Sequence, residues 1–140
     1  MQYMLLVYHQ EQELMEMPEA ELAKVVGDCI AFMGELEASG HHVASQGLQS
    51  VSTATTLRNN NGRISMTDGP FAETKEVLGG FTIVEARDLN EALQLASKFP
   101  TTRLGSIEVR PVMDPTQEMS NSLDRKLASA VKTAMMANCG

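Results

Sequence analysis

Residues 79–100 read GGFTIVEARDLNEALQLASKFP, and they contain the signals of a strand and a helix in succession. The β-branched and aromatic run Phe81–Ala86 predicts a strand that begins at two glycines. Asp88 stands where a helix N-cap accepts a backbone hydrogen bond, and Glu91 follows at capping-box spacing. Pro100 ends the helix. The predicted buried face of this helix consists of Ala92, Leu93, Leu95, Ala96 and Phe99.

A last strand, Ser106 to Val112, completes a β-α-β unit, because its residues alternate between apolar and charged. The N-terminal part of the chain repeats this order. Residues 2–9 are almost continuously apolar, which is typical of a strand covered on both faces. We expect an acidic loop next, then a helix from Pro18 to Gly40 and a strand at Val43–Leu48. The apolar stripe predicted on this helix consists of Leu22, Val25, Val26, Cys29, Ile30, Met33 and Leu36.

A hairpin is predicted between the two β-α-β units. The segments Ser52–Arg58 and Arg63–Thr67 flank the turn Asn59-Asn60-Asn61-Gly62, whose residue types tolerate positive φ. The order β-α-β, hairpin, β-α-β predicts an α+β fold, a ferredoxin-like antiparallel sheet with both helices on one face. The other face carries Met4, Leu6 and Ile83, so we expect it to pack against a second copy in a homodimer.

The chain beyond this plan forms a predicted helical extension. Residues 1–113 make up the ferredoxin-like domain and residues 114–140 the extension. Because one side of the extension is apolar, we expect it to dock on its own subunit or on a partner. The apolar residues at helical spacing are Met119, Leu123, Leu127, Ala130, Val131 and Ala134.

Composition excludes several classes of function. The 140 residues are 43% apolar, which disfavours disorder, and no apolar run is long enough to span a membrane. The net charge is −7, with eight acids and one base in residues 1–40, so neither nucleic-acid nor membrane binding is expected. Cys29 and Cys139 lack metal or redox spacing, and a reducing cytoplasm is the expected location.

One stretch is more specific than the rest: residues 67–81, TDGPFAETKEVLGGF. It resembles the DGPF signature of the YCII-related family. Residues 4–8, 47–49, 53–58 and 108–112 also resemble that family, so the resemblance covers roughly residues 2–113. It implies a dimeric α+β barrel, in which two ferredoxin-like units pack their sheets together.

The resemblance implies little about chemistry. The wider barrel group includes small monooxygenases, lactone isomerases and haem proteins, and some DGPF proteins are associated with extracytoplasmic-function sigma factors. One subset of the YCII group has a His and an Asp proposed as a catalytic pair. The matching positions hold Cys29 and Ala38, so that pair does not carry over to this chain.

Asp68 is the first candidate for a functional residue. It stands where a strand meets a turn, as a general base or a hydrogen-bond acceptor, and Gly69, Pro70 and Phe71 complete the predicted ligand-binding turn. The structural alternative is an Asx-turn, in which the carboxylate bonds its own backbone.

Charged residues near this turn are further candidates. Glu73, Lys75 and Glu76 either close a polar pocket or form a solvated loop with a local ion pair. Arg110 suits a carboxylate or phosphate ligand, or it pairs with a neighbouring acid such as Glu108, Glu85 or Asp68.

His9 ends the first strand and is a candidate acid–base group, predicted to face the same pocket as Tyr8. Gly79-Gly80 is interpreted as a bulge or a tight strand entry and not as a phosphate site. His41 and His42 are adjacent on a strand and point to opposite faces, so no metal site is expected. No cofactor motif appears, and no tightly bound cofactor is predicted.

Three functions remain open. The first is a small-ligand-binding or regulatory module with a polar pocket near the DGPF turn. The second is a cofactor-free enzyme in which Asp68 or His9 moves a proton on a small acidic or carbonyl substrate. The third is a protein-interaction module linked to sigma-factor regulation, which would use the C-terminal extension or the acidic first helix.

Overall fold

The computed structural model describes residues 1–139. The chain divides into two units, and the boundary in the sequence falls between Arg110 and Pro111. The second unit contains the helix α4 (Ser122–Asn138). Two short 3-10 helices, η1 (Val51–Thr53) and η2 (Pro100–Arg103), belong to the first unit. The other elements are β1 (Gln2–His9), α1 (Glu11–Glu16), α2 (Glu19–Ala38), β2 (His42–Gly47), β3 (Thr55–Asn60), β4 (Arg63–Asp68), β5 (Val77–Glu85), α3 (Leu89–Ser97) and β6 (Gly105–Pro111).

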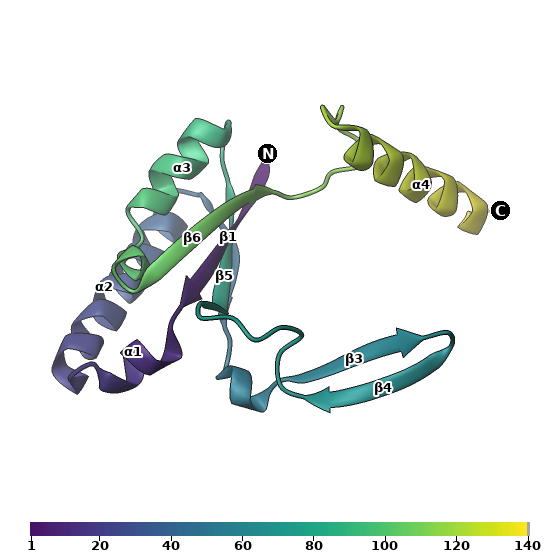
Figure 1. Ribbon diagram of the computed structural model, residues 1–140. Coiled ribbons are helices and arrows are strands. Elements are labelled where there is room, and N and C mark those ends of the chain that lie inside the picture. The colour runs from purple at the N-terminus through teal and green to yellow at the C-terminus, as the bar shows by residue number, and fades with distance from the viewer. Residues whose placement is uncertain (140) are drawn as a thin grey trace. The chain divides into compact units, whose positions relative to one another are not determined.

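The main sheet has four strands in the order β2-β5-β1-β6. The strand β5 lies between β2 and β1 and is antiparallel to both. Both β-α-β units therefore cross over an intervening strand, and α2 and α3 lie on the same face of the sheet (Figure 1). This arrangement confirms the predicted ferredoxin-like α+β fold.

The two faces of the sheet differ in burial. Tyr3, Leu5 and Val84 point to the helices and are buried, as strand alternation requires. Met4 and Leu6 point to the opposite face and are half-buried. The hydrophobic core of this unit therefore lies between the sheet and the helices.

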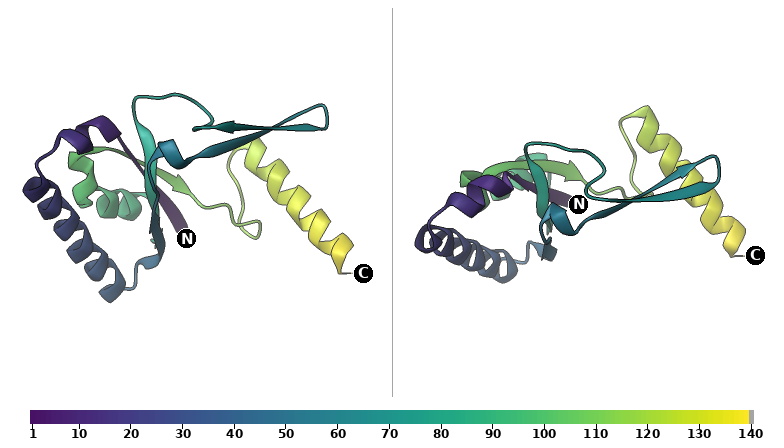
Figure 2. Two further views of the ribbon diagram at one scale, coloured as in Figure 1. Left: turned by 90° about the horizontal axis from the view of Figure 1, so that it is seen from below. Right: turned by 60° about the horizontal axis from the view of Figure 1, so that its bottom comes forward.

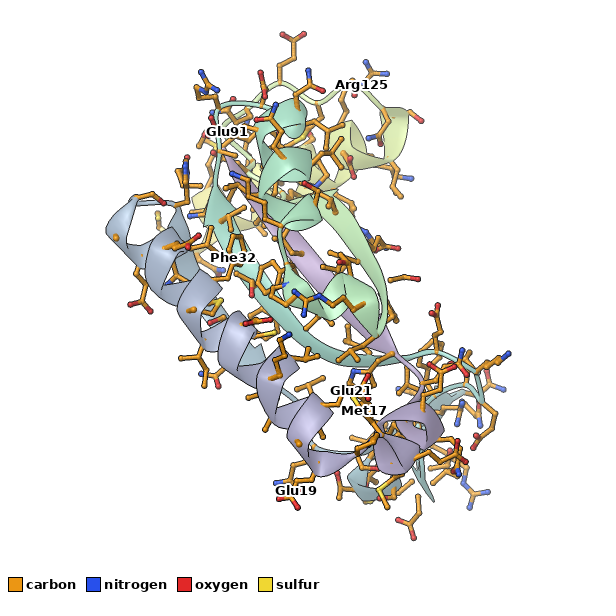
Figure 3. The ribbon with its side chains drawn as sticks, turned by 90° about the vertical axis from the view of Figure 1, so that its left-hand side faces the viewer. Met17, Glu19, Glu21, Phe32, Glu91 and Arg125 are labelled. Carbon is orange, nitrogen blue, oxygen red and sulfur yellow. The ribbon has the colours of Figure 1, made fainter. Side chains whose placement is uncertain are left out.

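The buried side of α2 agrees with the predicted stripe at Val25 and Leu36 but adds Phe32, which the stripe did not include. Phe32 is buried and points into the layer between α2 and α3 (Figure 3), where its ring meets that of Phe99 edge to face, with centroids 4.9 Å apart. Val26 and Ile30 were predicted to be buried, but they are 48% and 69% exposed. The buried positions Val25, Phe32 and Leu36 are separated by seven and then four residues, so they share one side of the helix, and Ile30 lies away from it.

The helix α3 shows the same kind of correction. Its Ala92, Leu95 and Ala96 are buried as predicted, whereas Leu93 is exposed. The cap is confirmed, because the Asp88 carboxylate accepts a hydrogen bond from the Glu91 backbone at 2.9 Å. Glu91 itself bonds to Arg87, at 2.5 Å from Nε, so it does not close a reciprocal capping box.

Residues 11–16 form the helix α1, where an acidic loop was predicted. Glutamate, glutamine, leucine and methionine are strong helix formers, and Glu11 and Glu13 favour the N-terminal end. The Glu11 carboxylate accepts hydrogen bonds from Ser50 Oγ at 2.7 Å and from the Val51 amide at 3.2 Å, which attach α1 to η1.

The predicted hairpin is confirmed as a separate sheet of β3 and β4, which projects from the main sheet (Figure 2). Asn61 and Gly62 occupy its turn with φ values of 54° and 87°, as a type I′ turn requires. Leu57 pairs with Met66 across the hairpin, and these side chains are 62% and 75% exposed.

The predicted C-terminal helix is confirmed as α4, which begins after Asn121. The side chain of Asn121 caps it by accepting a hydrogen bond from the Asp124 amide at 2.8 Å. Within residues 1–139, no helix has the length and apolarity needed to cross a membrane.

Candidate functional site

A cavity of about 440 Å³ lies between α2 and the main sheet and opens to solvent. We call it the helix–sheet cavity. The sheet contributes residues from β1, β2 and β5, and α1 and η2 lie at its sides. Its side-chain lining is mainly Val7, His9, Leu14, Leu22, Val26, Cys29, Met33, Thr82, Phe99, Thr101 and Leu104.

The backbone around His9 is close-packed, because glycines stand on both sides of it. A Cβ on Gly79 would lie 2.0 Å from the His9 Cε1, so only glycine leaves room for this ring. A Cβ on Gly105 would lie 2.1 Å from the Tyr8 carbonyl oxygen. The pairing of β1 with β5 shifts between Val7 and Tyr8, which confirms the predicted bulge at the two glycines. The imidazole position is therefore fixed by packing.

Three polar side chains of the cavity lack protein hydrogen-bond partners. Within residues 1–139, no hydrogen bond reaches the His9 ring nitrogens or the hydroxyl of Thr82, a residue that is only 4% exposed. Thr101 has a buried hydroxyl, likewise without a partner in this part of the chain. Ser45 differs, because its hydroxyl lies 3.0 Å from the Nε2 of His42. Unpaired polar groups beside an apolar cavity are the groups that a ligand can bond.

Cys29 contributes a neutral thiol to the same cavity. Burial raises the pKa of this thiol, and the Asp28 carboxylate raises it further. Arg103 and the Thr101 backbone act in the opposite direction, but the net pKa stays above its ordinary value. The thiol is therefore protonated at neutral pH and is a poor nucleophile.

The DGPF turn belongs to the hairpin. The Gly69 amide donates to the Ala54 carbonyl at 2.8 Å, and the Thr56 hydroxyl donates to the Gly69 carbonyl at 2.8 Å. Arg58 donates to the Phe71 carbonyl at 2.7 Å. Asp68 is exposed, and its carboxylate forms no hydrogen bond with residues 1–139, so the alternative Asx-turn is not formed.

The other predicted ligand-binding residues lie outside the helix–sheet cavity. Glu73 and Lys75 are exposed, and Glu76 accepts a hydrogen bond from Ser106 Oγ at 3.2 Å. Arg110 forms an ion pair with Glu108 at 2.9 Å, as its structural alternative predicted. His9 lines the cavity, whereas the remaining predicted site residues do not; these are Tyr8, Asp68, Gly69, Pro70, Phe71, Glu73, Lys75 and Arg110. A site at the DGPF turn stays a prediction.

Sequence reasoning did not single out Thr82 or Thr101. Strand alternation could have identified Thr82, because it is the polar residue on the inward face of Phe81–Ala86. Thr101 lies after the proline that ends α3, where no periodic pattern indicates which way a side chain points.

His41 precedes β2 and His42 begins it, and both rings make other contacts. The His41 Nδ1 lies 3.0 Å from the Glu85 carbonyl oxygen, and His42 bonds to Ser45. Within residues 1–139, no three His, Cys, Asp or Glu residues are grouped as metal ligands would be.

Comparison with known proteins shows the family. The YCII-related domain family matches residues 1–116. An uncharacterised protein of Rhizobium meliloti is 35% identical over 116 residues, which are 80% of this chain and 92% of that protein. A solved structure of 5-chloro-2-hydroxyhydroquinone dehydrochlorinase from Burkholderia phenoliruptrix, in complex with 2,5-dihydroxybenzoquinone, is 15% identical with a TM-score of 0.43, and the match covers 80% of this chain and 93% of that one. From the matched family and its relative, the chain belongs to the YCII-related domain family.

Proposed function

We propose that the protein is a small-molecule-binding module whose ligand occupies the helix–sheet cavity. One observation carries the proposal: an apolar cavity of about 440 Å³ contains an imidazole whose nitrogens have no hydrogen-bond partner within residues 1–139. Ligand pockets usually combine an apolar lining with a few polar groups, and this volume is in their range. The proposal places the ligand at His9 and away from the DGPF turn.

The test uses a neutral fluorescent probe, N-phenyl-1-naphthylamine, whose emission rises in an apolar site. The wild-type protein is expected to bind one probe per chain. Val26→Trp fills the cavity from α2 and should abolish binding. Ile30→Trp is the matched control, because Ile30 lies on the same helix, is exposed and does not line the cavity. Equal binding by both variants, or no binding by the wild type, would refute the proposal.

The assembly we propose is a homodimer through the open face of the main sheet. Met4, Leu6, Phe81 and Ile83 are half-buried on the face opposite α2 and α3, and no other helix of residues 1–110 lies there (Figure 1). A face of this kind favours burial against a second copy. Light scattering distinguishes the two states, because the protomer mass is 15.2 kDa.

The cofactor-free enzyme is a second candidate function, and His9 is the observation that favours it. An imidazole with both nitrogens free can donate or accept a proton. His9→Gln keeps hydrogen bonding but loses imidazole chemistry. Once a ligand is found, loss of turnover with retained affinity in this variant would indicate an enzyme. An unaltered ligand after incubation with the wild type would indicate a binding module.

The sequence assigned the protein-interaction alternative to the C-terminal extension or the acidic first helix, and the hairpin offers a further surface for it. One face of the hairpin carries Leu57 and Met66, which pair across β3 and β4, and also Ile64 of β4. All three side chains are exposed. Exposed apolar side chains on one face are typical of protein contacts. Replacement of Leu57 and Met66 by serine should abolish such contacts and leave probe binding in the helix–sheet cavity unchanged.

A further inference from the structure

The lining of the helix–sheet cavity contains no Lys, Arg, Asp or Glu side chain. An ion pair joins Arg103 to Asp28 at 3.0 Å, and neither residue lines the cavity. An ionised ligand group would therefore lose its hydration without gaining a counter-charge. Burying an unpaired charge in apolar surroundings costs far more than burying a polar group that is hydrogen-bonded.

Two hydroxyls and one imidazole are among the polar side chains of the cavity. Thr82 offers a hydroxyl from the sheet, and Thr101 offers one from η2. His9 offers two ring nitrogens for hydrogen bonding, and its ring packs against Gly79. A ligand oxygen that accepts or donates one hydrogen bond matches these groups.

We infer that the ligand is an uncharged, compact apolar molecule that carries a hydroxyl or carbonyl group bonded by His9. This inference rests on the proposed function of the same cavity, and it names the class of compound. It excludes carboxylates, phosphates and ammonium compounds as ligands of this cavity. The sequence left open an acidic or a carbonyl substrate, and this inference retains only the carbonyl class.

The test compares probes with one rigid carbon cage and different head groups. These are 1-adamantanol, 2-adamantanone, 1-adamantanecarboxylate and the 1-adamantylammonium ion, each titrated against bound N-phenyl-1-naphthylamine at pH 7.5. We expect the alcohol and the ketone to displace the fluorophore at concentrations at least tenfold lower than either ion requires. We expect His9→Phe to weaken 1-adamantanol by about threefold to tenfold more than it weakens the fluorophore, because only the alcohol loses a hydrogen bond to the imidazole.

The outcomes separate the two proposals. Failure of the fluorophore to bind at all overturns the proposed function and this inference together. If the fluorophore binds but the carboxylate or the ammonium ion displaces it as well as the alcohol does, the cavity is a binding site and the uncharged class is wrong. If His9→Phe leaves the affinity for 1-adamantanol unchanged, the assignment of the hydrogen bond to His9 is wrong.

Discussion

His9 and Gly79 act as a pair at the scale of single residues. A Cβ on Gly79 would overlap the imidazole at 2.0 Å, so Gly79→Ala must displace the ring. We expect a loss of about 1–3 kcal/mol in the free energy of unfolding, as for other overpacked sites, together with weaker 1-adamantanol binding. Urea denaturation measures the first effect and probe displacement the second.

The His9→Ala background supplies the control for this pair. When the ring is absent, Gly79→Ala should cost much less, so the double-mutant cycle shows a coupling energy. Gly34→Ala is the matched glycine control, because a Cβ there meets nothing within 4 Å and should raise stability by up to about 1 kcal/mol. Equal costs of Gly79→Ala in both backgrounds would show that the ring is not held by this contact.

Cys29 gives a pH-dependent prediction. Because burial and then Asp28 raise the pKa of its thiol, we expect iodoacetamide to label Cys29 slowly at neutral pH in a Cys139→Ser background. The rate should rise as the pH approaches the raised pKa from below, since the thiolate is the reactive form. Asp28→Asn removes a cause of the raised pKa and should therefore speed labelling at pH 8. Mass spectrometry follows the reaction.

Two results would contradict this assignment. Faster labelling of Cys29 than of free cysteine at pH 7 would mean that the thiol is activated. An unchanged rate in Asp28→Asn, with circular dichroism matching the wild type, would mean that the carboxylate does not act on the thiol. Saturating N-phenyl-1-naphthylamine should also protect Cys29, because the thiol lines the proposed site.

The sequence predicted His9 as a candidate but could not rank it above Asp68. Asp68 lies in the most specific motif of the chain, whereas His9 is a single residue at a strand end. We propose His9 as a site residue because it packs on Gly79 and lines one cavity with Thr82 and Thr101, which come together only when β1, β5 and η2 pack. Short-range spacing holds no information on such contacts.

At the scale of elements, α2 provides a test of how the core is built. Phe32→Ala removes a buried ring that packs on Phe99 and should lower stability by about 3–5 kcal/mol. Ile30→Ala, two positions away, removes an exposed side chain and should change stability by no more than about 0.5 kcal/mol. Urea denaturation measures both values. Similar losses of stability in the two variants would indicate that α2 packs against the core through a different side of the helix.

The elements themselves were largely predictable. Local signals set the hairpin turn at Asn61 and Gly62 and the cap at Asp88, and the structure confirms both. The prediction failed where tertiary packing chooses among local options. The predicted stripe on α2 included Ile30 and left out Phe32, but a helix buries only the side that meets the rest of the core, so Phe32 is buried and Ile30 faces solvent. The helix α1 was missed because its acidic composition was interpreted as a loop.

At the scale of the whole molecule, we predict that the open sheet face holds two copies together. Leu6→Lys places a charge on that face and should convert a dimer of twice 15.2 kDa to a monomer, as measured by light scattering at micromolar concentration. Ile30→Lys, on the helix-covered side, is the control and should remain a dimer. A wild-type protein found only as a monomer, or a Leu6→Lys variant that remains dimeric, would contradict this interface.

The most direct test of the central claim is to locate the bound probe by NMR. We would record intermolecular NOEs between N-phenyl-1-naphthylamine and the wild-type protein with labelled methyl groups, histidine rings and phenylalanine rings. We predict NOEs to Val7 and Val26 and to the Cε1 proton of His9, because these residues line the helix–sheet cavity. NOEs confined to the hairpin residues Leu57 and Met66, or to Phe71 of the DGPF turn, would contradict it.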